Sequence, residues 1–124
     1  MTELLLVALG GALGACARLW VGALVASRLG EAFPWGTLVV NATGAFAIGV
    51  VAATLPEGRA WLGLVVGALG SYTTVSSFSL QTIELAGRGA MAAAAGNVLL
   101  SLALCLGGAR AGMAIGGLVA GGGG

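Results

Sequence analysis

The stretch GSYTTVSSFSLQT, residues 70–82, gathers hydrogen-bonding side chains within a chain that is otherwise strongly apolar. Its hydroxyl and amide groups belong to Ser71, Tyr72, Thr73, Thr74, Ser76, Ser77, Ser79, Gln81 and Thr82. Scattered hydroxyls in membrane helices usually bond to carbonyls four residues earlier or to a neighbouring helix, and this structural role is one explanation. A dense cluster beside Gly70 instead favours an interrupted helix, whose freed backbone groups can face an ion.

Four of the other polar residues inside apolar segments are candidates for the same site: Arg18, Asn41, Asn97 and Ser101. Arg18 either reaches a membrane interface or supplies the positive field that an anion path needs. The Asn41 amide can donate two hydrogen bonds, and Asn97 and Ser101, four residues apart, share one face of a helix. Glu84, near the end of an apolar segment, is the one carboxylate that could lie deep among them. This balance favours an anion over a cation or a proton as the transported species.

Enzyme chemistry is disfavoured by the residues that the chain lacks. There is no histidine and no lysine, and the four acidic residues all lie near the ends of apolar segments: Glu3, Glu31, Glu57 and Glu84. A nucleophile and base pair cannot be assembled from these groups, so we predict that no reaction is catalysed. Cys16 and Cys105 are isolated and are expected to act as small hydrophobic residues. A net charge of +1 offers no basic patch for nucleic acid.

The elements that must position the polar groups are four apolar segments, residues 4–27, 35–55, 60–85 and 90–112. Each approaches or exceeds the roughly 20 residues that cross a bilayer as a helix. Only 7% of the 124 residues are charged, against about 25% in soluble domains. Pro34 and Pro56 bracket the second segment. We therefore predict an all-α membrane protein in which residues 1–124 form one four-helix unit, with the third helix broken near residues 70–74. The first segment lacks signal-peptide features and is predicted to be retained.

Arginines are balanced between the two predicted sides of the membrane. Arg28 and Arg88 fall in the first and third connections, whereas Arg59 and, if the last span ends early, Arg110 fall on the opposite side. Since arginine and lysine in short loops set orientation, equal counts predict insertion in both directions and an antiparallel dimer. The 24 glycines predict close approach of the helices.

Three segments together resemble signatures of the CrcB/Fluc family of fluoride channels. They are GGALGACARLW at residues 10–20, PWGTLVVNATGAFAIG at residues 34–49 and GSYTTVSSFSLQT at residues 70–82. The resemblance covers nearly the whole chain, in order and with matching spacing. It implies a multi-pass protein of the cell inner membrane that works as an antiparallel dual-topology dimer. Such a dimer exports fluoride through two pores, each lined by both subunits.

The resemblance also implies roles for particular residues. Arg18 matches the family arginine, Asn41 matches the pore-lining asparagine, and Phe78 matches the second of two phenylalanines whose ring edges contact fluoride. The backbone carbonyls of Gly70 and Thr73 match the positions that hold a structural sodium ion at the dimer centre, the one cofactor that we expect. The residues expected along the fluoride path are Asn41, Thr74, Val75, Ser77, Phe78, Asn97 and Ser101.

The chain departs from the family pattern at four positions. Val75 stands where the family has its first phenylalanine, and Asn97 stands where a tyrosine is usual. Gln81 replaces the usual glutamate, and Ser71 replaces a second glycine. A ring edge carries partial positive charge that can face an anion, and a valine does not. Either the remaining groups suffice in a homodimer, or the chain pairs with a paralogous subunit in a two-gene channel and does not conduct alone.

Two further functions fit a short helical membrane protein, a proton-coupled exporter and a scaffold. Small multidrug exporters are also short four-helix proteins of dual topology, but they need a membrane-embedded carboxylate to exchange protons for a cationic drug. Residues 4–27 contain none. A subunit that only scaffolds a larger complex would explain the glycines and would leave the polar residues 70–82 unexplained.

Overall fold

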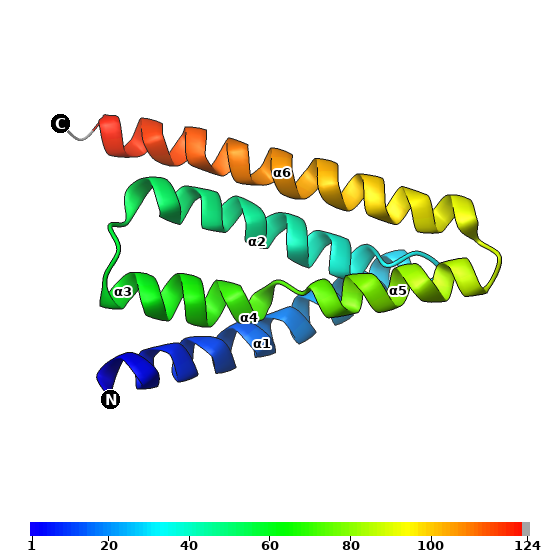
Figure 1. The fold of residues 1–124 in the computed structure, drawn as a ribbon, viewed down its shortest axis with the longest axis horizontal. Helices are drawn as coiled ribbons and strands as arrows, with labels where there is room; N and C mark the ends of the chain where they lie inside the picture. Colours follow the sequence, from blue (N-terminus) through cyan, green and yellow to red (C-terminus); the bar gives the residue numbers. More distant parts are fainter. Residues whose placement is uncertain (123–124) are drawn as a thin grey trace.

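A computed structural model describes residues 1–122, and this range contains helices and no strands. Three long helices are α1 (Thr2–Leu29), α2 (Trp35–Thr54) and α6 (Met91–Gly121), and each is long and apolar enough to cross a membrane. Figure 1 shows them beside a fourth helical run, with successive runs pointing in opposite directions and both termini at the same end. The prediction of an all-α chain with membrane-spanning helices is confirmed.

The fourth helical run consists of consecutive pieces: α3 (Arg59–Trp61), the π-helix η1 (Leu62–Leu69), α4 (Gly70–Tyr72) and α5 (Val75–Gly87). Between α4 and α5 the backbone leaves the helical conformation. Thr73 has φ −77° and ψ 155°, and Thr74 has φ −149° and ψ 124°, so both residues are extended. We call residues 73–74 the junction; it lies midway along the run in Figure 1.

The last helix is longer than the sequence predicts. It runs to Gly121 rather than ending near residue 112, and it lies against α2 as far as Gly116, where a Cβ would stand 2.8 Å from the Val50 carbonyl oxygen. Arg110 therefore lies inside a helix. It does not belong to the arginines beyond the last span, because that span does not end early. Residues 123–124, the end of the predicted unit, lie outside the described residues.

Glycines set the spacing between the helices. A Cβ on Gly49 would meet the carbonyl oxygen of Ala109, and one on Gly112 would meet that of Phe46, so α2 and α6 are in backbone contact. A Cβ on Gly14 would likewise meet the carbonyl oxygen of Ala68, so α1 packs closely against η1. Close backbone approach of this kind is typical of helix contacts in membranes, where small residues line the interface.

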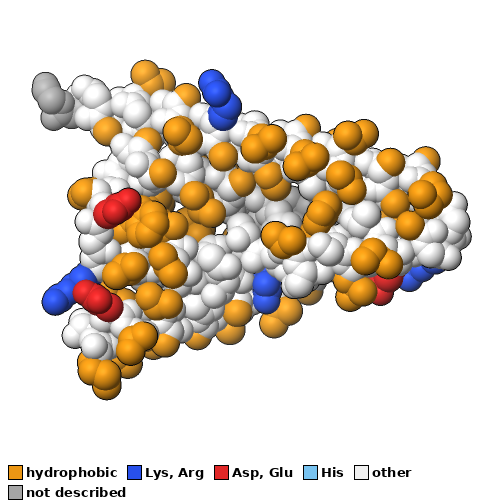
Figure 2. Space-filling view, viewed as in Figure 1, with side chains coloured by type: hydrophobic (Ala, Val, Ile, Leu, Met, Phe, Trp, Pro, Cys, Tyr) orange, Lys and Arg blue, Asp and Glu red, His pale blue; other side chains and the backbone are white. Residues whose placement is uncertain are grey.

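Large apolar side chains point outward rather than inward. The buried apolar residues are few, Leu38, Val40, Leu85 and Ala94, whereas leucines along α1 and α6 are mostly exposed. Figure 2 shows apolar side chains along the whole visible face, with few charged groups among them. A soluble domain would bury such residues; a surface of this kind suits hydrocarbon surroundings.

Candidate functional site

Asn41 of α2 faces the junction and pairs with the backbone of Thr74. Its Nδ2 donates to the Thr74 carbonyl oxygen over 2.8 Å, and its Oδ1 accepts from the Thr74 backbone N–H over 2.7 Å. One side-chain amide thus satisfies both backbone groups of an extended residue, as a neighbouring strand would. Thr74 is only 8% exposed, so without this pair two buried polar groups would lack partners at considerable cost.

The hydroxyl groups at the junction bond locally. Thr73 Oγ1 donates to the Leu69 carbonyl oxygen over 3.1 Å, which caps the end of the preceding helical run. Thr74 Oγ1 accepts from the Ser77 N–H over 3.2 Å, which is the N-cap arrangement at the start of α5, and it also contacts Ser76 Oγ at 3.1 Å. The structural explanation of the polar stretch therefore accounts for these hydroxyls.

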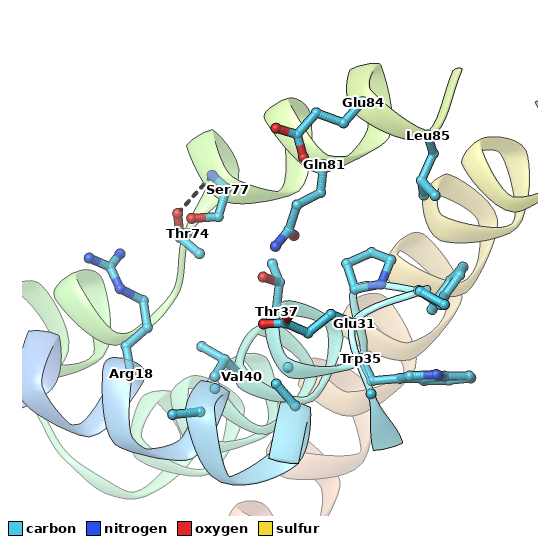
Figure 3. A pocket seen from close by; sticks show the side chains of 18 of the residues that line it. Arg18, Glu31, Trp35, Thr37, Val40, Thr74, Ser77, Gln81, Glu84 and Leu85 are labelled. Carbon is cyan, nitrogen blue, oxygen red and sulfur yellow. Dashed lines mark hydrogen bonds between the residues drawn. The ribbon is translucent and has the colours of Figure 1, made fainter. Parts of the chain in front are cut away.

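A cavity of about 530 Å³ opens on one side of the junction, and we call it the Arg18 cavity. It lies between α1, the connection before α2, the start of α2 and α5 (Figure 3). Its polar lining comprises Arg18, Glu31, Thr37, Thr74, Ser77, Gln81, Glu84 and Arg88. In Figure 3 the Arg18 side chain extends toward the start of α5, where Thr74 and Ser77 lie. Positive charge thus stands close to neutral hydroxyl groups.

Gln81 brings an unusual polar atom to the Arg18 cavity. Its Oε1 is buried and has no hydrogen-bond partner within residues 1–122. In Figure 3 the amide points across the cavity toward Thr37 of α2. The sequence marked Gln81 only as a departure from the family pattern and did not point to Thr37 at all, because a single threonine in an apolar helix carries no distinguishing signal.

A second cavity of about 500 Å³ lies on the other side of the junction, and we call it the Asn41 cavity. It brings together seven residues expected at the site, namely Asn41, Gly70, Thr73, Thr74, Val75, Phe78 and Ser101. Thr74 lines both cavities and so stands between them. Cys105 also lines this cavity, one helical turn beyond Ser101; its spacing of four from Ser101 was the signal that could have identified it.

Asn97 lines neither of these two cavities. It is 2% exposed, and its Nδ2 donates to Thr82 Oγ1 over 2.9 Å, while Thr82 Oγ1 donates to the Phe78 carbonyl oxygen over 2.7 Å. The asparagine therefore ties α6 to the part of α5 that carries Phe78. Ser101, by contrast, does reach the Asn41 cavity.

The carbonyls of Gly70 and Thr73 fit the sodium ligands that the resemblance implies. In an unbroken α-helix the Gly70 oxygen would accept from Thr74 N–H, and the Thr73 oxygen would accept from Ser77 N–H. Here Thr74 N–H bonds to Asn41 Oδ1, and Ser77 N–H bonds to Thr74 Oγ1. Both carbonyls thus lack their usual helical donors, and carbonyl oxygen is a ligand that hard cations accept.

Comparison with known proteins gives consistent results. A family model described as "CrcB-like protein, Camphor Resistance (CrcB)" matches residues 5–113. The chain is 51% identical over 113 residues to the "Fluoride-specific ion channel FluC" of Opitutus terrae, covering 86% of each chain. It is 48% identical over 122 residues to the protein of that name from Rhodospirillum centenum, covering 93% of this chain and 95% of the relative. The protein of that name from Rhodospirillum rubrum is 48% identical over 109 residues, covering 82% and 84%.

Proposed function

The chain belongs to the CrcB-like family, and from this premise we propose that it forms a fluoride-selective channel that exports fluoride across the cell inner membrane. It is a multi-pass membrane protein, and its family is one of ion channels rather than enzymes. The observation that carries the proposal is the 51% identity to a fluoride-specific ion channel over 86% of both chains. The two cavities that meet at Thr74 support it.

The proposed path runs from the Arg18 cavity past Thr74 into the Asn41 cavity. Fluoride is small and strongly hydrated, so a path must replace its water with other hydrogen-bond donors. Ser77 hydroxyl lies on the first side, and Ser101 hydroxyl and the Phe78 ring lie on the second. Conduction requires sites that bind well enough to admit an ion and weakly enough to release it, and neutral donors meet this condition. Arg18 then acts from the wider cavity as a positive vestibule.

The proposed assembly is an antiparallel dimer of dual topology with two pores, the junction at membrane depth and one structural sodium ion at the centre. Val75 supports a partner at this face, because it is 76% exposed at the rim of the Asn41 cavity. The carbonyls of Gly70 and Thr73 would hold the sodium ion, which supplies charge to fix four oxygens from two chains.

A second candidate is a partner subunit of a two-gene channel, and Val75 is the observation that favours it. The residue replaces one of the family's two phenylalanines, so a homodimer would lack that ring in both pores. A paralogous partner would restore one. The multidrug exporter gains no support, since the one acidic residue of α1 is Glu3 in its first turn.

Ion efflux from liposomes containing this chain alone tests the proposal. We expect fluoride efflux to exceed chloride efflux at least a hundredfold and to fall at least a hundredfold in Asn41→Asp, whose carboxylate repels an anion. Thr54→Val, which removes a hydroxyl bonded to Val50 at the end of α2, is the matched control and should conduct normally. Equal chloride efflux would refute selectivity. Silence that a co-expressed paralogue relieves would establish the two-gene candidate instead.

Thiol labelling tests the dual topology. Cysteines placed at positions 32 and 57, in the same connections as Arg28 and Arg59 and with both arginines kept, should each react with an impermeant reagent from both sides of the membrane once Cys16 and Cys105 are replaced by alanine. Labelling of each position from one side only would replace the antiparallel homodimer with an assembly of fixed orientation.

A further inference from the structure

We infer that Asn41 and the Thr74 hydroxyl are positioning groups for a cation site, because they divert the two backbone donors that would otherwise occupy the carbonyl oxygens of Gly70 and Thr73. The inference rests on the proposed function in one respect, the sodium ion at these carbonyls. It goes beyond that function by assigning Asn41 a task other than direct contact with fluoride.

Asn41 is the group that keeps the Gly70 carbonyl free of its helical donor. Thr74 N–H is the donor that a continuous helix would direct at Gly70, and its bond to Asn41 Oδ1, at 2.7 Å, takes it away. The second bond of the pair, from Asn41 Nδ2 to the Thr74 carbonyl at 2.8 Å, holds the residue extended. One of the two N–H groups of Asn41 Nδ2 is thereby used, which leaves a single one for an ion in the Asn41 cavity.

The Thr74 hydroxyl is the group that keeps the Thr73 carbonyl free of its helical donor. Ser77 N–H would bond to the Thr73 carbonyl in a continuous helix, and instead it bonds to Thr74 Oγ1 at 3.2 Å. Two side chains, one from α2 and one from the junction itself, thus act on two carbonyls three residues apart. Because the two diversions use different donors and different acceptors, the loss of either should weaken a cation site, and the loss of both should weaken it most.

Sodium-dependent melting of the purified full-length protein in detergent tests the inference. The melting temperature is measured while NaCl replaces N-methyl-D-glucamine chloride at constant ionic strength, because a ligand that binds the folded state raises it. We expect a saturable rise for the unmodified chain, and a sodium midpoint at least tenfold higher in both Asn41→Leu and Thr74→Val. Thr54→Val removes a threonine hydroxyl far along α2 and should leave the midpoint unchanged.

A backbone substitution separates diversion of the donor from any other role of Asn41. Replacing Thr74 by its α-hydroxy acid, through ligation of peptide segments, converts the amide before Thr74 into an ester and removes the N–H itself. The ester also makes the Thr73 carbonyl a weaker ligand, so the reference is the Thr74 ester alone: with no donor left to divert, adding Asn41→Leu to this ester should move the sodium midpoint by less than about threefold. In the corresponding ester at Val75, which keeps the Thr74 N–H, adding Asn41→Leu should still raise the sodium midpoint at least tenfold.

Several outcomes would overturn the inference. They are an unmodified chain whose melting temperature is indifferent to sodium, an Asn41→Leu midpoint that does not move, and an Asn41→Leu shift that stays tenfold or larger when it is measured against the Thr74 ester alone. If Asn41→Leu does not fold, the sodium midpoint of Thr74→Val tests the inference at the Thr73 carbonyl alone. Liposome efflux is measured separately, so selective fluoride conduction without any sodium effect would leave the channel standing and remove this assignment.

Discussion

Along the α2–α6 contact, two continuous helices approach until glycines such as Gly49 and Gly112 face carbonyl oxygens of the other helix. At the junction the backbone leaves the helix, and the side chains of Asn41 and Thr74 take over bonds that a helix would make within itself. A continuous helix satisfies its own backbone and needs only small residues to approach a neighbour. An interrupted one depends on particular polar groups, so substitutions at the two regions should have different consequences.

The largest effect is expected where the helices touch. Gly112→Leu places a side chain against the Phe46 carbonyl, where nothing can move aside without separating α2 from α6. Overpacking of this kind should cost about 3 kcal/mol or more, and we expect loss of the folded protein on size-exclusion chromatography in detergent. Gly117→Leu is the matched control, since no atom lies within 4 Å of a Cβ there. Equal recovery of the two variants would show that the α2–α6 distance is not set by Gly112.

The two regions also differ in how far sequence alone predicts them. Pro34 and Pro56 flank α2, whose bounds are Trp35 and Thr54, because each proline restricts the backbone at its own position. Glycine abundance predicted close helix contacts for an equally local reason. The length of α6 was not predicted, because the contact with α2 continues past residue 112 to Gly116, and no local signal within residues 112–121 reports that contact.

The junction is predictable only in part. Gly70 and the threonine pair indicated where a helix could end, but Asn41 and Thr74 are 33 residues apart in sequence, and no local pattern reports such a pair. The Asn41 amide was predicted to face an ion because the sequence does not reveal its hydrogen bonds to the Thr74 backbone. The same holds for Asn97, whose bond to Thr82 crosses from α6 to α5. Their roles in conduction stay predictions.

The next effect concerns the polar contact between α5 and α6, which resembles the junction in relying on side chains. Asn97→Ala removes a 2% exposed amide and its bond to Thr82, and we expect a loss of about 2 kcal/mol in the free energy of unfolding. Combined with Thr82→Val, the loss should fall short of additivity by about 1 kcal/mol, because both changes delete the same bond. If the losses in unfolding free energy add strictly in thermal or denaturant melts, the two side chains do not interact.

A smaller effect is expected at the start of α5. Thr74→Val keeps the shape of the side chain but removes the oxygen that accepts from Ser77 N–H, which should cost about 1 kcal/mol, as N-cap losses do. The pair between Asn41 and the Thr74 backbone does not involve this oxygen and should persist. Thr74→Ser retains the oxygen and serves as the control. A Thr74→Ser variant as unstable as Thr74→Val would show that the lost stability comes from the methyl group and not from the hydroxyl.

The smallest effect on stability, and the one most informative for conduction, is expected at Val75. This residue begins α5 directly after the junction and is 76% exposed, so Val75→Phe adds a ring without displacing a neighbour within the chain and should change stability by no more than about 0.5 kcal/mol. The added ring edge offers partial positive charge to an anion in the Asn41 cavity, and fluoride efflux from liposomes should rise severalfold. Val75→Leu, which adds apolar volume without a ring, should leave efflux unchanged. An equal rise in both variants would attribute the effect to volume rather than ring charge, whereas no rise in either would show that the ring is dispensable beside Phe78. Because the substitution leaves the α2–α6 contact and the Asn41–Thr74 pair untouched, any change in efflux reports the pore lining and not the framework that holds it.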